Sequence, residues 1–322
     1  MALTLTDWIP VFESEYLAEF VPSGGSSVKI VSSAAGSASL VLDSLGAAGG
    51  RRGFLLARLD AGETRIQFID QVFFAVSRQV DWVGLSQNWL RGQFAANGLV
   101  VPADQPLSDL DAIAAGMGIS PREVMGEVRR WIFNGLQKDY GLAREFRTAI
   151  AMLCQAALNP VNVSPDDVDV LVKWLRGERT SSKALKKLQI FSRIGRHNAR
   201  YLLTSLSRWA HLNGHAGLVV LIDAGAVWNL PPEGPPEPKV KYSRNACLDF
   251  FEVLRQFIDE TDELQHFLLA VAVPSEFWTD PKKGVAGYSA LQMRVADEVR
   301  DRNQANPLGA AVRLEVPMEV HA

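Results

Sequence analysis

The apolar residues of the chain form two kinds of pattern, short continuous runs and longer stretches with helical spacing. The short runs lie at 28–31, 53–59, 217–222, 267–273 and 312–316. Continuous apolar runs of this length are typical of strands that are buried on both faces of a parallel sheet. Helical spacing occurs at 40–45, 65–80, 244–260 and 287–303. Because strands and helices alternate at both ends of the chain, the sequence predicts an α/β fold with a parallel sheet flanked by helices.

The middle of the chain has several helix patterns and almost no strand pattern. A chain of 322 residues suits one large domain with an insertion better than three small domains. We therefore expect residues 1–85 and 209–322 to be the two halves of one α/β core. Residues 86–208 are expected to form a helical insertion between these halves.

A loop of small residues, 32–39, follows the first predicted strand and leads into the helical run 40–45. Strand, small-residue loop and helix is the layout of a P-loop, whose pattern is G-x-x-x-x-G-K-[ST]. The sequence therefore predicts the fold of a P-loop NTPase. The residues of this loop that would form a vestigial nucleotide site are Ser32, Gly36, Ser37, Ala38 and Ser39.

Only the last position of the P-loop pattern keeps its residue type. Ser39 matches the serine or threonine of the pattern, whereas Ser32 and Ser37 replace its glycines. Ala38 replaces the lysine, which in P-loop enzymes supplies the charge that meets the β- and γ-phosphates. The loop thus keeps the layout of a nucleotide site without its principal cation.

A second apolar run, 217–222, ends in an acid, Asp223. In P-loop ATPases the acid at the end of such a strand holds Mg²⁺, and in many of them the next residue is a glutamate that activates water. Here the next residue is Ala224. Ala38 and Ala224 therefore stand at the two positions that hydrolysis most needs, and Asp223 is a magnesium ligand only if nucleotide binds.

Several stretches distributed over nearly the whole chain resemble one family. They are 16–17 with 24–29, 53–59, residue 209 with 214–223, 248–257, 270–278, 287–294 and 312–314. Together they resemble the P-loop ATP-binding proteins of BREX-type phage-defence systems, the BrxD-like group. The resemblance implies an AAA+-like ATPase domain with a helical insertion, working in an oligomer or hetero-complex with other defence-system proteins. It also implies that Arg294 is a candidate arginine finger or sensor.

The departures from the family pattern leave more than one function open. The first is a non-catalytic, pseudo-ATPase subunit that acts as a scaffold of a bacterial anti-phage complex and contacts DNA, with no cofactor expected. The second is a protein of the same system that binds or hydrolyses ATP with Mg²⁺ weakly, because loop N–H groups and a helix N-terminus attract phosphate without lysine. The third is a DNA-binding regulator.

The regulator interpretation depends on residues 110–124, which resemble a helix-turn-helix or winged-helix element. Ala114 would lie in the first helix and Gly118 in the turn. Ser120 followed by Pro121 is a typical helix start, with serine as N-cap and proline at the first helical position. A simple helical hairpin explains the same pattern.

Charge is concentrated in residues 173–208, which contain ten basic residues and one acid, Glu178, for a net charge of 10 − 1 = +9. The remaining chain then carries −3 − 9 = −12. A basic segment on an otherwise acidic protein is the expected footprint of phosphate contacts, and duplex DNA and an acidic protein partner both fit it. The candidate contact residues are Lys183, Lys186, Lys187, Arg193 and Arg196.

Composition narrows the setting of the protein. The hydrophobic content of 48% and charged content of 21% are ordinary for a globular chain. The two cysteines, Cys154 and Cys247, do not make a disulfide framework. No signal-peptide pattern and no run of about 18 apolar residues occurs, so we expect a cytoplasmic protein without a membrane partner.

Overall fold

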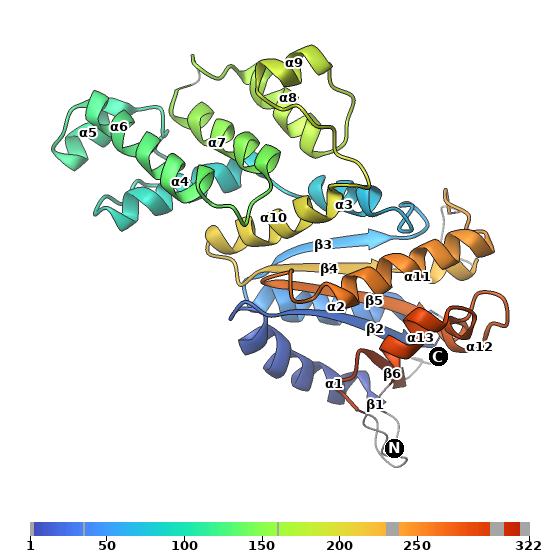
Figure 1. Cartoon of the computed structure of the whole chain (residues 1–322). Coiled ribbons are helices and arrows are strands. Elements are labelled where there is room, and N and C mark those ends of the chain that lie inside the picture. Colours follow the sequence, from blue (N-terminus) through green and yellow to red (C-terminus); the bar gives the residue numbers. More distant parts are fainter. Residues whose placement is uncertain (1–2, 35, 160, 230–237, 297–305, 316–322) are drawn as a thin grey trace, which may run out of the picture. The chain divides into compact units, whose positions relative to one another are not determined.

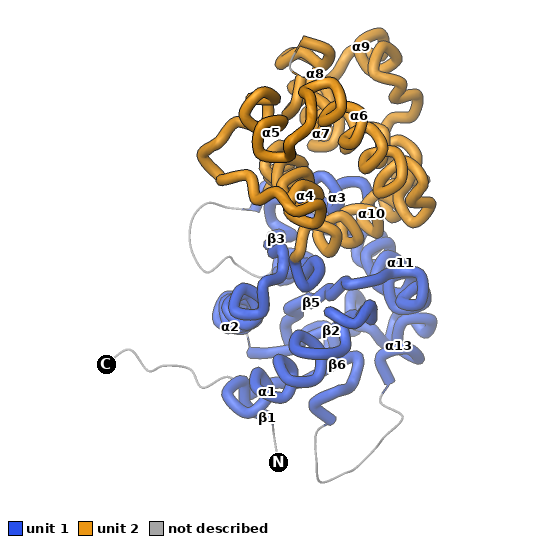
Figure 2. Tube along the Cα trace, turned by 90° about the vertical axis from the view of Figure 1, so that its left-hand side faces the viewer, with its two compact units in different colours: residues 1–76, 215–322 blue, residues 77–214 orange. Residues whose placement is uncertain are grey.

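A computed structural model of the chain describes residues 3–34, 36–159, 161–229, 238–296 and 306–315. The chain divides into two compact units, which are described separately (Figure 2). Unit 1 comprises Met1–Val76 and His215–Ala322, and unit 2 comprises Ser77–Gly214. The predicted divisions at 85/86 and 208/209 fall inside two helices of unit 2, α4 (Trp82–Ala96) and α10 (Ala199–Leu212).

Unit 1 is built on a six-stranded sheet whose described strand pairs are all parallel. Its strands are β1 (Leu3–Thr4), β2 (Ser26–Ser33), β3 (Leu55–Asp60), β4 (Leu218–Asp223), β5 (Phe267–Pro274) and β6 (Ala311–Glu315). Their order across the sheet is β1-β6-β2-β5-β4-β3 (Figure 1). The predicted parallel sheet and its five strands are therefore confirmed, except that position 316 of the last predicted strand lies outside the described residues. The strand β1 is a short addition at one edge.

The central strands are apolar on both sides because both faces of the sheet are covered. All eight residues of β5 are buried, as are the first five of β4. Helices α1 (Leu5–Phe12) and α2 (Ala38–Arg51) and the π-helix η1 (Glu13–Phe20) pack on one face, where Val31, Leu221 and Ala270 join the core.

The helix that follows the loop lies very close to the sheet at Gly49. A Cβ atom at this position would lie 2.8 Å from Cδ2 of Leu56 on β3 and 3.8 Å from Cγ2 of Val219 on β4. Glycine therefore allows this approach without displacing the side chain of Leu56. This contact holds the C-terminal half of α2 against β3 and β4, whose last residues are Asp60 and Asp223.

The opposite face of the sheet carries the helices from the C-terminal part of the chain (Figure 1). They are α11 (Arg244–Asp259), α12 (Glu276–Thr279), α13 (Ser289–Val295) and the short 3₁₀ turns η3 (Gly225–Trp228) and η4 (Val285–Gly287). Cys247, Phe250, Phe251 and Leu254 are buried along α11. Their spacing of three and four is the helical spacing that the sequence showed.

Two helices differ in extent from the sequence prediction. The helix predicted over 65–80 begins only at α3 (Ile69–Ser77), because Tyr242 holds the preceding turn: its hydroxyl accepts from the Ile66 amide at 3.1 Å and donates to the Thr64 carbonyl at 2.7 Å. The helix predicted over 287–303 ends at Val295, since Ala296 takes an extended conformation. Positions 297–303 of that prediction lie outside the described residues.

Unit 2 is helical, as predicted, and no strand occurs in its described residues, which exclude only position 160. Besides α4 and α10 it contains α5 (Leu110–Met117), α6 (Pro121–Ile132), η2 (Phe133–Gln137), α7 (Arg144–Leu158), α8 (Pro165–Leu175) and α9 (Ser182–Lys187). Ser120 caps α6 in a reciprocal pair with Glu123, Pro121 is at its start, and Gly118 has φ of 66°. The predicted helix, turn and helix are present, but the described residues contain no strands that could form a wing.

A buried lysine joins three segments of unit 1. Lys29 on β2 is 2% exposed, and its Nζ donates to the hydroxyl of Tyr16 at 2.6 Å and to the carbonyls of Leu308 and Gly309 at 2.6 and 2.9 Å. All three ammonium protons are thereby used. None of these acceptors is a carboxylate, and burial lowers the pKa of Lys29 from 10.5 to about 7. Lys29 is therefore a structural residue of the sheet and takes no part in the loop that follows it.

The lowered pKa of Lys29 makes the stability of unit 1 depend on pH. Between about pH 7 and 10.5 the unfolded chain binds more protons at this lysine than the folded chain, so the free energy of unfolding rises with pH. From about pH 7.5 to 9.5 we expect a rise on the order of 2 kcal/mol in chemical denaturation. Lys29→Met should remove this rise, and Lys241→Met, at an exposed lysine, should keep it. The same rise in Lys29→Met as in the parent would contradict the assignment.

Candidate functional site

The register of the sheet brings the loop and the predicted acid together at the carboxyl end of the strands. Val31 of β2 lies opposite Ala272 of β5, and Ala272 lies opposite Asp223 of β4. Neighbouring strands are about 4.8 Å apart, so the start of the loop and Asp223 are separated by about 10 Å across one strand. This edge is the place where open parallel sheets bind ligands.

The loop after β2 is closed on itself by its own serine. Ser37 donates to the carbonyl oxygen of Ala34 twice, from its backbone N–H at 3.2 Å and from its hydroxyl at 2.6 Å. Gly36 takes the left-handed conformation with φ of 83°, and Ser32 is buried at the end of β2. The Ser37 N–H, which in a P-loop would be offered to phosphate, therefore has an internal acceptor.

The first turn of α2 carries a charged network. The hydroxyl of Ser39 donates to Oδ2 of Asp43 at 3.4 Å and accepts from Nη2 of Arg58 at 3.2 Å. Nη1 of Arg58 forms an ion pair with Oδ1 of Asp43. The serine that matches the magnesium-binding position of a P-loop thus lies between a guanidinium and a carboxylate of the same chain.

The acid at the end of β4 is held by the backbone that follows it. Oδ1 of Asp223 accepts from the amide of Gly225 at 2.9 Å. Burial raises the pKa of Asp223, and the negative charge of Asp60 adds to that rise, while the Gly225 bond and the charge of Arg58 lower it. Asp60 is the register partner of Asp223 on β3. Ala224 is completely buried, so the position of the usual catalytic glutamate has no access to solvent.

This edge also carries Asp43, Arg58 and Asp60, which the sequence motifs did not identify. Arg58 and Asp60 are the exposed positions that alternate with buried Ala57 and Leu59 on β3. Polar residues at alternating positions of an otherwise apolar strand are a signal that could have identified them. Their proximity to Ser39 and Asp223 depends on the sheet order and could not be obtained from sequence spacing.

The residues at this edge differ from those of a P-loop ATPase at two positions, Ala38 and Ala224. Ser39 and Asp223 supply oxygen atoms of the kind that Mg²⁺ prefers, but Ala38 offers no charge to a phosphate. In the part of the chain that the structure describes, no three His, Cys, Asp or Glu side chains gather as they would to hold a metal. The guanidinium of Arg58, which donates to Ser39, forms an ion pair with Asp43.

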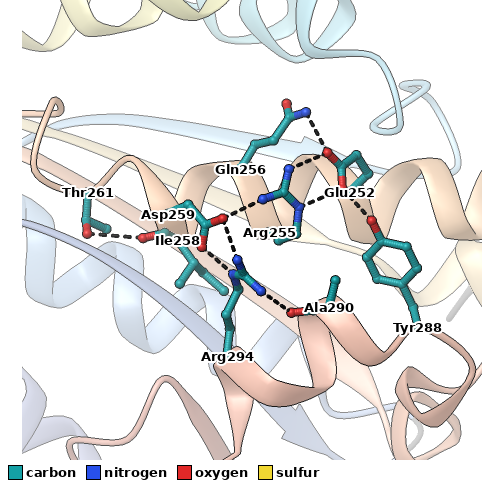
Figure 3. A network of polar contacts seen from close by, with 9 residues as sticks. All are labelled: Glu252, Arg255, Gln256, Ile258, Asp259, Thr261, Tyr288, Ala290 and Arg294. Carbon is teal, nitrogen blue, oxygen red and sulfur yellow. Dashed lines mark hydrogen bonds and ion pairs between the residues drawn. The ribbon is translucent and has the colours of Figure 1, made fainter.

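Arg294 lies in a different network, between α11 and α13 (Figure 3). Its guanidinium pairs with both oxygens of Asp259, with Nη2 to Oδ2 at 2.8 Å, and Nη1 donates to the carbonyl of Ala290 at 2.6 Å. Arg255 bridges Asp259 and Glu252. Hydrogen bonds to Glu252, the one from Arg255 first among them, lower its pKa to about 2. The described contacts of Arg294 therefore fix one helix on another, and a role as arginine finger or sensor stays a prediction.

The five basic candidate residues are all exposed in unit 2. Lys183, Lys186 and Lys187 lie on α9, and Arg193 and Arg196 lie on the segment between α9 and α10. Lys187 forms an ion pair with Asp167 of α8, with Nζ–Oδ1 at 2.9 Å. This pair lowers the pKa of Asp167 and reduces the charge that Lys187 offers to a partner.

A parallel sheet with a strand–loop–helix and an acid at the same edge is consistent with a P-loop NTPase-like fold. The chain belongs to the family of BREX system ATP-binding proteins BrxC/D, whose family model matches residues 122–319. The match includes Asp223, Arg294 and the basic segment but begins after the loop at 32–39. Neither a curated protein nor a solved structure is similar enough to the chain to count as a match. Among the described residues, no helix has the length and apolarity needed to cross a membrane.

The electrostatics of the sheet edge can be tested through the pKa of Asp223. Arg58→Met should raise this pKa, because a positive charge that lowers it is removed, and Asp60→Asn should lower it, because a negative charge that raises it is removed. Carboxyl ¹³C shifts during a pH titration measure both changes. Asp280, whose pKa is lowered by the Lys283 and Lys282 amides, serves as an internal control. A pKa of Asp223 that does not change in either variant would contradict the described charge cluster.

Proposed function

We propose that this protein is a non-catalytic, AAA+-like subunit of a bacterial BREX-type defence complex, in which the former nucleotide edge has become part of the scaffold. The observation that carries the proposal is the network of Ser39, Asp43 and Arg58. These three side chains contact one another at the place where a P-loop ATPase holds Mg²⁺ and phosphate. An internal ion pair there supports a structural role for this edge.

The chemistry of hydrolysis supports the same conclusion. Catalysis of phosphoryl transfer depends on positioning and on positive charge at the developing negative charge. Removing one such group typically costs ~10²–10³ in rate. Two groups are absent here, at Ala38 and Ala224, and the second position is fully buried. The losses are large enough that residual nucleotide binding would not restore turnover.

Weak nucleotide binding is the second candidate function, and one observation favours it. No side chain caps the N-terminus of α2, so its first N–H groups have no side-chain acceptor. Arg58 could supply the cation that Ala38 lacks if it left Asp43 for a phosphate, because guanidinium binds phosphate in a bidentate manner. In this case ATP with Mg²⁺ would be a cofactor, with Ser39 and Asp223 as ligands of the metal.

The setting of the proposed subunit follows from the family. Membership in a BREX family implies other proteins of the system as partners, and we propose that they meet this chain in an oligomer or hetero-complex in the cytoplasm. The basic segment of unit 2 would provide a contact to DNA or to a partner. A separate role as a DNA-binding regulator has less support, because α5 and α6 lack accompanying wing strands in the described part of unit 2.

Phosphate release tests the proposal directly. With Mg²⁺ and ATP, in the presence and absence of DNA, we expect no steady-state turnover above that of Asp223→Ala. The parent and Asp223→Ala should have the same turnover because both lack the groups that stabilise the transition state. A turnover of about one per second that Asp223→Ala abolishes would contradict the proposal.

Equilibrium binding of a fluorescent ATP analogue separates the two candidate functions. The pseudo-ATPase proposal predicts that binding is absent and that Arg58→Met leaves it absent. Weak binding that Arg58→Met removes would support the second candidate. Arg52→Met is the matched control, because Arg52 is an exposed arginine of unit 1 that pairs with Glu13 at the other end of α2.

A further inference from the structure

The chain reverses direction directly after α9, and the reversal brings Arg193 back to the start of that helix. Gln189 takes the left-handed conformation with φ of 57°, which is uncommon for a residue other than glycine. The amide of Ile190 then donates to the carbonyl of Leu185 at 2.9 Å. Three residues further on, Nη2 of Arg193 donates to the hydroxyl of Ser182 at 3.1 Å. The segment after Gln189 therefore runs back along α9 towards its start.

This reversal creates a surface that we call the basic turn, formed by Lys183, Lys186, Phe191 and Arg193. Lys183 and Lys186 are three residues apart on α9 and therefore share one face of the helix. Lys183 and Lys186 are exposed, whereas the apolar side chains of the same stretch, Leu185, Leu188 and Ile190, are buried. Phe191 lies between the two hydrogen bonds that anchor the segment, and it is 63% exposed.

The cations of the basic turn are available to an external anion. None of the described residues forms an ion pair with Lys183, Lys186 or Arg193, in contrast to Lys187, which is paired with Asp167. The segment 173–208 carries +9 with a single acid. A surface of this kind fits a polyanion, and its affinity would come from released counterions.

The exposed ring of Phe191 indicates which kind of polyanion the basic turn binds. Two other exposed aromatic residues of unit 2 already carry a cation on the ring: Lys138 lies 4.9 Å from the ring centre of Phe133, and Arg147 lies 5.0 Å from that of Tyr140. No described cation lies over the ring of Phe191, although Lys187 and Arg193 flank it in the sequence. An exposed ring beside backbone-binding cations is the combination that binds single strands, because every unpaired base can stack on it.

We infer that the basic turn binds single-stranded nucleic acid, with Lys183, Lys186 and Arg193 on the phosphates and Phe191 stacked on an unpaired base. The inference deepens the proposed contact role of the basic segment and rests on that role, but it does not depend on the loss of ATP hydrolysis. Binding is expected to tolerate any base sequence and to be weaker for a duplex, whose bases are not available for stacking. It assigns Lys187 a minor part, since Asp167 holds its charge.

Fluorescence anisotropy of the full chain with a labelled oligothymidine of about 20 nucleotides, and with a duplex of the same length, tests the inference. The oligothymidine should bind more tightly than the duplex. Phe191→Ala should weaken binding of the single strand about tenfold without changing its dependence on salt. Replacing Lys183 and Lys186 together by alanine should make the dependence of log affinity on log salt less steep, by the amount expected for the loss of about two phosphate contacts.

Two controls make these outcomes specific. Phe133→Ala removes another exposed aromatic ring, one that already has a cation, and Arg129→Glu changes an exposed charge on α6; both variants should bind as the parent does. Thermal unfolding should not distinguish the variants, because the altered side chains are exposed. The inference would be overturned if the parent bound the duplex more tightly than the single strand. It would also be overturned if Phe191→Ala or the double lysine variant bound the single strand as tightly as the parent. Loss of binding in Arg129→Glu would likewise overturn it by assigning the nucleic-acid contact to α6. Because no ATP is present, none of these results depends on the pseudo-ATPase proposal.

Discussion

The pairing of β5 with both β2 and β4 is the constraint on which the rest of unit 1 depends. Every residue of β5 is buried, and its register with the two neighbouring strands runs along most of their length. The strand places the end of β2, with its small-residue loop, one strand away from Asp223. Shifting the register by one residue would turn every side chain of the shifted strand to the opposite face of the sheet. The geometry of the carboxyl edge is therefore fixed by hydrophobic packing, independently of any ligand.

The positive charge at that edge, on Arg58, is paired within the chain. Arg58 lies beside Ser39 and Asp43 and also lowers the pKa of Asp223, which burial and Asp60 raise. In a P-loop ATPase the corresponding charges belong to lysine, Mg²⁺ and phosphate. Exposed pairs such as Arg58–Asp43 contribute only about 0–1 kcal/mol to stability. The network therefore contributes little to stability. Its importance is that it lies at the position where a P-loop ATPase holds Mg²⁺ and phosphate.

The features that could be predicted from the sequence are those that depend on local patterns. Continuous apolar runs predicted the strands, and Ser120 with Pro121 predicted the start of α6, because burial and capping leave their signal in adjacent residues. The early end of α13 at Val295 was not predicted, because apolar spacing continues beyond it. The position of Arg58 beside Ser39 could not be predicted, because it depends on the order of the strands in the sheet.

The basic segment is a second case in which the sequence predicted the composition of a surface but not its contacts. Its composition predicted a charged surface, but a count of charges cannot show that Lys187 is paired with Asp167, twenty residues earlier in the chain. Nor does the sequence show that Gln189 turns the chain back so that Arg193 reaches Ser182. Contacts between residues of different elements decide which cations are available, and these contacts follow from the packing of unit 2.

A crystal structure grown with Mg²⁺ and a non-hydrolysable ATP analogue would test the central claim most directly, because it shows what occupies the edge between Ser39 and Asp223. The account predicts that Arg58 stays paired with Asp43, that Ser37 stays bonded to Ala34, and that no nucleotide density lies at the first turn of α2. Triphosphate density there, with the guanidinium of Arg58 turned from Asp43 to a phosphate and Mg²⁺ between Ser39 and Asp223, would contradict it.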